Sequence, residues 1–145
     1  VLSLLNDLGE PLFVGDHAQA TMLKLISNMI GASINVLLAQ IASVVRAVKI
    51  DPDFAVKALS MGGANNAQLF RLIWQVKKNH GELFSLELAQ HVVQIAIDSA
   101  KKYYNIKSLP TVELTNTIMI IAKSMGLGKK DSSEVSKLFD MINES

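Results

Sequence analysis

The residues best suited to chemistry are a lysine and an asparagine, Lys24 and Asn28, in an otherwise apolar stretch of the sequence. Residues four apart lie one turn apart on the same face of a helix, and Gly31 and Asn35 continue that face. An ammonium group partly withdrawn from water can give and take a proton near neutral pH. The carboxamide beside it could hold a substrate hydroxyl or carbonyl. The same spacing also fits a lysine that extends into solvent near a helix start, so both interpretations stay open.

Other kinds of site have little support in the sequence. The three histidines, His17, His80 and His91, are far apart and show no paired ligand spacing, so no metal site is predicted. The absence of cysteine excludes disulfides and thiolate chemistry and is compatible with a reducing compartment. The motifs GxSxG, HExxH and GxGxxG are also absent. The chain by itself therefore holds neither a complete catalytic apparatus nor a dinucleotide fingerprint.

The composition is that of one rather apolar domain. Of the 145 residues, 50% are hydrophobic and only 19% are charged, so some of the apolar surface should be hidden against a partner or a second domain. The formal net charge is +1, without a basic block. This balance argues against nucleic acid or an anionic membrane as the main ligand.

One long helix is predicted from Asp16, a plausible N-cap, to about Lys49, because this stretch lacks proline and is apolar on most faces. Its uncharged window is also long enough for a membrane span. Several polar side chains favour a buried helix instead, namely those of Ser27, Asn28, Ser33, Asn35, Gln40 and Ser43. A helix with apolar residues on most faces needs neighbours all around it, so we expect other helices and a second subunit to cover it.

Further helices are predicted over residues 52–61, 65–79, 84–104, 110–126 and 131–144. Asp51 followed by Pro52 and the Asp131 to Glu134 spacing are typical helix starts. Residues 1–8 have a short helical pattern, and residues 12–14 read as a short leftover strand. The predicted fold is therefore all-α, a bundle of five to six main helices around one long buried helix.

The residues around Lys24 resemble a motif of the β-hydroxyacid dehydrogenase family, which includes the 3-hydroxyisobutyrate dehydrogenases and tartronate semialdehyde reductases. The segment VGDHAQATMLKLISN is similar to the family pattern G-x-x-G-x-G-x-x-x-K-x-x-N-N. Gly15 falls on its first glycine, Lys24 on the lysine and Asn28 on the second asparagine. Three positions differ from the pattern, namely Ala18, Ala20 and Ser27.

A second segment, FSLELAQHVVQIAIDSA, is similar to the family pattern F-x-x-x-L-x-x-K-D-L-x-L-A-x-x-x-A. Phe84 and Leu88 match its first two fixed positions. His91 stands where the family has a lysine that approaches the cofactor, and Val92 where it has an aspartate. The alternative is that His91 belongs only to the core or surface of its helix.

The resemblance implies an NAD(P)-dependent oxidoreductase that acts on a small β-hydroxy acid. Lys24 would transfer the proton, Asn28 would position the substrate and His91 would approach NAD or NADP. Residues 1–15 would be the tail end of an upstream Rossmann domain that binds most of the cofactor, and residues 16–145 a helical substrate and dimerisation domain. The implied protein is a homodimer of the cytoplasm or an organelle matrix, without a membrane, nucleic-acid or metal partner.

The resemblance leaves several points open. The sequence does not identify the hydroxy acid or distinguish NAD from NADP, and we expect the 145-residue chain to be inactive alone. The alternative function is that of a non-catalytic relative that serves as an oligomerisation or partner-binding module. The altered motif positions favour this alternative, whereas the retained Lys24 counts against it.

Overall fold

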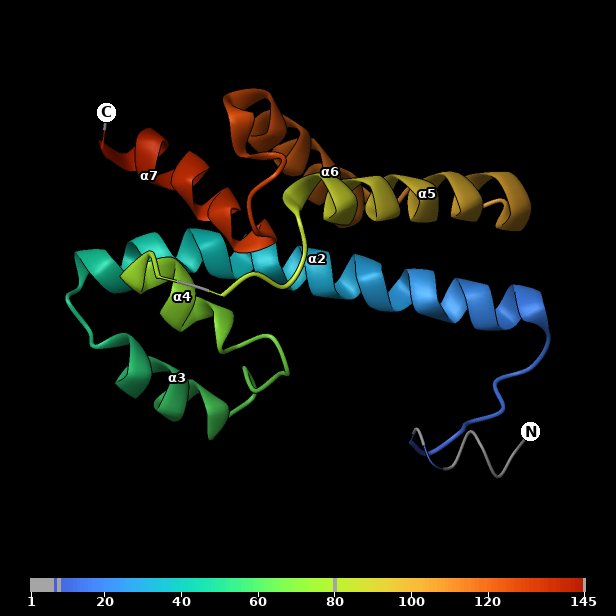
Figure 1. The fold of residues 1–145 in the computed structure, drawn as a ribbon, viewed down its shortest axis with the longest axis horizontal. Helices are drawn as coiled ribbons and strands as arrows, with labels where there is room; N and C mark the ends of the chain where they lie inside the picture. The colour runs from blue at the N-terminus through green and yellow to red at the C-terminus, as the bar shows by residue number, and fades with distance from the viewer. Residues whose placement is uncertain (1–6, 8, 80, 145) are drawn as a thin grey trace.

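A computed structural model of the chain describes residues 7, 9–79 and 81–144, and this part contains six α-helices. The longest helix, α2 (His17–Ala47), runs through the whole molecule, and the other helices pack along its sides (Figure 1). At 1.5 Å per residue α2 is about 46 Å long. The predicted all-α bundle around one long helix is confirmed.

The start of α2 is fixed by its own sequence. The Asp16 carboxylate accepts a hydrogen bond from the backbone N–H of Gln19, and the Gln19 side chain accepts one from the backbone N–H of Asp16, both at 2.9 Å. This reciprocal capping box satisfies two N–H groups that the first turn of a helix leaves without partners. The chain leaves the helix through Lys49, whose φ of 57° is left-handed. Both ends agree with the sequence prediction.

The shorter helices cover different parts of α2 (Figure 1). Helices α3 (Pro52–Ser60) and α4 (Arg71–Lys77) lie beside its C-terminal half. Helices α5 (Leu86–Tyr104) and α6 (Pro110–Ala122) lie on another side and extend along its N-terminal half. The last helix, α7 (Ser136–Glu144), returns to the C-terminal half of α2.

Two hydrophobic clusters hold the bundle together. The larger joins the middle of α2 to α5, α6 and the turn before α7, and consists of Val36, Ala39, Leu86, Val93, Ile97, Met119, Ala122 and Val135. The other joins the C-terminal half of α2 to α3 and α4, and consists of Leu38, Ala42, Val45, Ala55, Leu69 and Leu72. Alanines of α2 in both clusters are fully buried, and their small side chains let the neighbouring helices approach closely.

The segment between α6 and α7 turns twice. A π-helical turn (Lys123–Leu127) follows α6, and Gly126 in it has a φ of 85°, which glycine adopts without strain. A 3-10 turn (Ser132–Val135) then leads into α7. Between these turns Asp131 forms an isolated antiparallel bridge with Ser85, the residue that caps α5. This bridge connects the start of α5 to the start of the last helical segment.

Two sequence predictions differ from the structure, and a third falls on residues that the structure does not describe. Helix α4 is shorter than predicted because the Asn66 side chain bonds locally, donating to Ala64 O at 2.8 Å and accepting from Gln68 N at 2.9 Å, so residues 65–70 form turns. Residues 12–14 are not a strand in this chain. The predicted short helix over residues 1–8 lies almost wholly outside the described residues.

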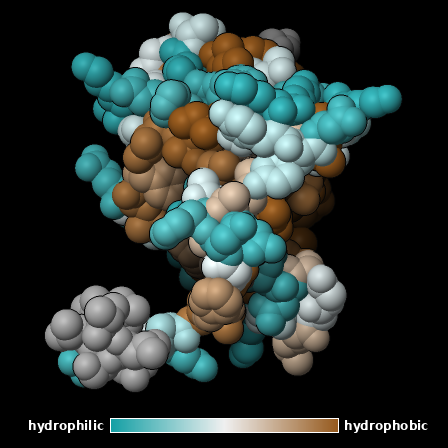
Figure 2. All heavy atoms as spheres, turned by 90° about the vertical axis from the view of Figure 1, so that its right-hand side faces the viewer, coloured by the Kyte–Doolittle hydropathy of each residue, from teal (hydrophilic) through white to brown (hydrophobic). Residues whose placement is uncertain are grey.

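The other described helices cover only part of the circumference of α2, and the expected second subunit would cover the remainder. Seven large apolar residues on one side of the helix remain exposed, and we call them the apolar stripe: Leu23, Ile26, Ile30, Leu37, Ile41, Val44 and Val48. Their three- and four-residue spacing keeps them on one face. Figure 2 shows that hydrophobic residues also reach the surface at the end of the molecule where α2 begins, between hydrophilic ones.

Within the described part of the chain, α2 is the one helix that is long and apolar enough to cross a membrane by length and composition. Core helices of soluble proteins meet the same criterion. In this structure 39% of its most apolar 18-residue window is buried against the rest of the chain.

Candidate active site

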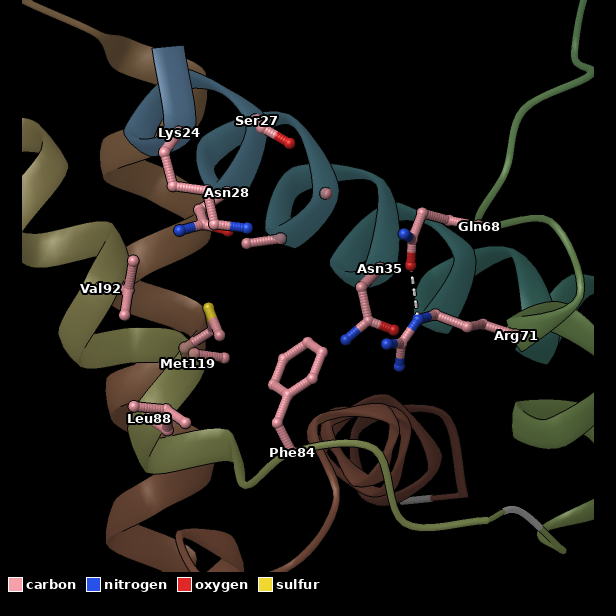
Figure 3. A pocket seen from close by; sticks show the side chains of 13 residues that line it. Lys24, Ser27, Asn28, Asn35, Gln68, Arg71, Phe84, Leu88, Val92 and Met119 are labelled. Carbon is pink, nitrogen blue, oxygen red and sulfur yellow. Dashed lines mark hydrogen bonds between the residues drawn. The ribbon is translucent and has the colours of Figure 1, made fainter. Parts of the chain in front are cut away.

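A cleft of about 450 Å³ opens between α2, the segment before α4 and the start of α5 (Figure 3). Its lining consists of Lys24, Ser27, Asn28, Gly31, Ala32, Asn35, Gln68, Arg71, Phe84, Leu88, Ala89, Val92 and Met119. The charged groups among these lining residues are two cations, Lys24 and Arg71, and none of the described residues that line the cleft is a carboxylate. Such a cleft favours an anionic ligand with some apolar surface.

The polar face of α2 forms one wall of the cleft, as the sequence predicts. Lys24 and Asn28 lie next to each other there, and Asn35 lies further along the helix (Figure 3). No atom lies within 4 Å of the position that a side chain on Gly31 would occupy, so this glycine leaves the middle of the wall open. Lys24 is exposed in this chain, which agrees with the interpretation of a lysine that extends into solvent. No described segment of the chain covers it, so another domain or subunit would have to withdraw it from water.

A buried polar cluster fixes the far end of the wall. The Gln75 side chain of α4 donates to the Asn35 side-chain oxygen at 2.9 Å, and the Asn35 amide donates to the backbone oxygen of Ser132 at 3.0 Å. Both side chains are buried, so these bonds satisfy groups that would otherwise be costly to remove from water. The bonds hold α2, α4 and the turn before α7 in one arrangement.

Arg71 reaches the cleft from the first position of α4 and is only 1% exposed. Its Nε donates to Gln68 Oε1 at 2.6 Å, and its Nη1 donates to Ser133 Oγ at 2.7 Å. The guanidinium lies over the rings of Phe70 and Phe84, at 5.7 Å and 5.3 Å from their centroids. Burial lowers the pKa of Arg71, and the nearby carboxylate of Asp131 partly opposes this shift. The group still remains charged at neutral pH.

Asp131 positions the loop that carries Phe84 into the cleft. Its Oδ2 accepts from the backbone N–H groups of Leu83 at 2.8 Å and Phe84 at 3.3 Å, and its Oδ1 accepts from Ser133 N at 2.9 Å. Burial by itself raises the pKa of this carboxyl group, but these hydrogen bonds outweigh it, so the pKa is lowered. The Asp131 carboxylate also lies 3.7 Å from Arg71 Nη1, and its negative charge stabilises the charged guanidinium.

His91 does not lie in the cleft with Lys24. It is exposed on α5 and lines a separate, smaller hollow together with Glu87, Leu88 and Lys123. Leu88 borders both spaces, so His91 is at the rim of the cleft. The structure thus brings Lys24 and Asn28 together, whereas His91 lies in the neighbouring hollow. Among the described residues no group of three or more His, Cys, Asp or Glu could hold a metal ion.

Two residues of the cleft, Arg71 and Gln68, were not predicted from the sequence. The one available signal was a lone arginine inside the apolar stretch LFRLIW, which indicates a buried cation with a dedicated partner. Its partners come from residues 131–133, far away in the chain, so no local spacing pointed to them.

The fold and site define an all-α domain with a long central helix, whose polar face carries a lysine and an asparagine into a cleft. A comparison with solved structures finds this fold in the 3-hydroxyisobutyrate dehydrogenase ygbJ from Salmonella typhimurium, with a TM-score of 0.74. The match covers 83% of this chain and 42% of that protein, at 18% sequence identity. No protein-family model and no curated protein matches the sequence. The predicted resemblance is therefore confirmed at the level of the fold.

Proposed function

We propose that this chain is the helical domain of an NAD(P)-dependent oxidoreductase that acts on a small β-hydroxy acid. The observation that carries the proposal is the position of Lys24 and Asn28. These two residues match the dehydrogenase motif, and they lie side by side in a cleft that bears positive charge. The fold of a known dehydrogenase around them supports the same function.

In the proposed reaction, the Lys24 amine takes the proton of the substrate hydroxyl when the alcohol is oxidised and returns it in the reverse direction. NAD or NADP, when bound, would supply the acceptor for the hydride of the hydroxyl-bearing carbon. Asn28 donates a hydrogen bond to the oxygen that changes from hydroxyl to carbonyl. The substrate carboxylate would be held largely by backbone and hydroxyl groups of the Rossmann domain, and the apolar side chains of Leu88 and Val92 would exclude water from one side of the cleft.

The cofactor would be held mainly by another part of the protein, because this chain has no dinucleotide fingerprint. Within the chain, the rim with His91 and Lys123 fits an anionic group of NAD or NADP, since both side chains can carry positive charge. Glu87 in the same hollow weakens this preference. The rim with His91 would therefore add only a weak contact to a cofactor that another part of the protein holds.

We further propose that residues 1–15 end an upstream Rossmann domain and that residues 16–145 form the helical domain. The chain spans 42% of the length of the dehydrogenase it resembles. Leu12 and Phe13 are 81% and 90% exposed in this chain, which suits packing against a further domain. A location in the cytoplasm or an organelle matrix belongs to the same proposal.

The experiment that tests the function is a cofactor-reduction assay of the full-length protein. It would be supplied with NAD⁺ or NADP⁺ and a panel of β-hydroxy acids, and formation of the reduced nicotinamide would be followed by absorbance. Hydroxy-acid-dependent reduction supports the proposal. Absence of turnover with every acid and both cofactors would favour a non-catalytic oligomerisation or partner-binding module, for which the apolar stripe is the supporting observation.

The apolar stripe is the proposed homodimer surface. Replacing Leu37, which is 54% exposed in its middle, with glutamate should weaken self-association by about tenfold or more, because each copy would bury an unpaired charge. Sedimentation velocity over a range of concentrations measures the effect. Ala58→Glu, at an exposed position of α3, is the matched control and should leave association unchanged. A wild-type protein that stays monomeric at high concentration would contradict the proposed dimer.

Replacing His91 with lysine should tighten cofactor binding by about two- to fivefold, the range of a single exposed charge contact. A lysine at this rim carries a full charge at neutral pH, whereas an imidazole carries less. The dissociation constants of NAD and NADP would be measured by fluorescence titration of the full-length protein. Ile95→Lys, one turn further along α5, is the control for added charge alone. Equal constants in wild type and His91→Lys would show that His91 has no cofactor role.

A further inference from the structure

The guanidinium of Arg71 has donors that the protein leaves free. An arginine has five N–H donors. The Nε–H group donates to Gln68, and the two N–H groups of Nη1 donate to the hydroxyls of Ser133 at 2.7 Å and Ser132 at 3.3 Å. Within the described residues Nη2 has no hydrogen-bond partner. Figure 3 shows the guanidinium beside Asn35 and across from the ring of Phe84, at the border of the cleft.

A purely structural role does not account for this arrangement. Burying a cation is costly, and the free donors on Nη2 keep access to solvent in the cleft instead of being sealed in the protein interior. The nearest carboxylate, Asp131, lies 3.7 Å from Nη1, and both of its oxygens already accept backbone N–H groups. Arg71 is therefore held in place from behind, while its remaining donors and part of its charge are left for a ligand.

The position of Arg71 limits what that ligand can be. Arg71 and Asn35 both bond to Ser132, so they lie at the same level of the cleft. Lys24 is three helical turns from Asn35, about 16 Å along the axis. In a β-hydroxy acid a single carbon separates the hydroxyl-bearing carbon from the carboxyl carbon. A group bound at Arg71 is thus not the carboxylate next to the reacting centre at Lys24.

We propose that Arg71 binds an oxyanion at the end of the cleft away from Lys24. Together with the proposed function, on which this step rests, the site assigns the substrate to hydroxy acids that carry a second anionic group, either a carboxylate or a phosphate ester. The planar fork of a guanidinium suits both groups. The absence of any carboxylate from the cleft lining removes the main source of repulsion.

The test is a calorimetric titration of the full-length protein without cofactor, using succinate, inorganic phosphate and the uncharged amide butyramide as probes. Wild type should bind succinate or phosphate at least tenfold more tightly than butyramide. Arg71→Lys and Arg71→Met should each remove this preference, because neither side chain presents the fork. Arg46→Lys is the matched control, since Arg46 pairs with Asp140 away from the cleft and should leave the affinities unchanged. Preference for succinate identifies a dicarboxylate substrate, and preference for phosphate a phosphate ester.

Thermal melting shows whether each variant is folded, and chemical-shift changes of the Gln68 side-chain amide in the wild type locate the bound probe without any substitution. Probe affinities that do not depend on Arg71, or an unshifted Gln68 amide, would overturn the oxyanion site. The titration requires no turnover, so it tests the site separately from the reaction. If the protein binds the probes through Arg71 but oxidises no hydroxy acid, the oxyanion site stands and the proposed reaction is refuted. If the protein is an active enzyme without Arg71-dependent binding, the reaction stands and the oxyanion site is refuted.

Discussion

Replacing Lys24 with alanine in the full-length enzyme should lower kcat by about 10²- to 10⁴-fold, the usual contribution of a general acid or base. The fold should be unaffected. Lys24 is exposed, and it makes no hydrogen bond or ion pair with the part of the chain that the structure describes. A large loss of turnover would then reflect chemistry and not unfolding. Steady-state kinetics in both reaction directions, with a thermal melt of each variant, measure the two effects separately.

Two further variants make the Lys24 experiment specific. Lys24→Arg keeps the positive charge but cannot exchange a proton near neutral pH, so it should lose nearly as much turnover as Lys24→Ala if proton transfer is the role. If Lys24 only attracts the anionic substrate, Lys24→Arg should be almost fully active and Lys24→Ala should raise KM. Lys57→Ala, at an exposed position on α3, controls for loss of one surface charge. Near-normal turnover of Lys24→Ala would contradict the proposed mechanism.

The helix boundaries could be predicted because their causes are local. Asp16 caps α2 with bonds to a residue three positions away, and Asp51 caps α3 by accepting from Phe54 N at 2.9 Å. Such signals lie within a few residues of sequence. The prediction failed for residues 65–70, where the Asn66 side chain bonds to nearby backbone and competes with the helix.

The polar face of α2 was predicted correctly, whereas the sequence left its degree of exposure open. Helical periodicity alone places Lys24, Asn28 and Asn35 on one face. Whether that face is covered depends on segments that pack from elsewhere. Asn35 is buried because Gln75 and Ser132 pack against it and form hydrogen bonds with it. Lys24 is exposed because no described segment packs over it.

Arg71 could not be predicted as a site residue because nothing near it in the sequence indicates its role. The chain folds residues 131–133 and Phe84 around it, and these contacts give the guanidinium its orientation. Only the resemblance of the Phe84 segment to a known motif pointed to this region. That motif suggested His91, which lies at the rim, and not Arg71, which lies in the cleft.

Replacing Asp131 with asparagine should lower the free energy of unfolding by about 3 kcal/mol, in the range for removing one partner from a buried ion pair. The substitution leaves Arg71 without its nearest negative charge. It also turns one acceptor of the backbone N–H groups of Leu83, Phe84 and Ser133 into a donor. Urea denaturation at neutral pH measures the change. Asp98→Asn, at an exposed carboxylate of α5, should change stability by less than about 0.5 kcal/mol.

The same variant should alter the acid sensitivity of the fold. The pKa of Asp131 is lowered in the folded protein, so its stabilising contribution is complete above the ordinary carboxyl value and is lost as the pH falls through the lower folded value. Below about pH 4 the wild type should therefore lose stability more steeply than Asp131→Asn, and the two unfolding free energies should converge. Parallel curves down to the lowest accessible pH would contradict an ionised Asp131 in the fold. Convergence would identify this carboxylate as the group that holds Phe84 and Arg71 at the cleft.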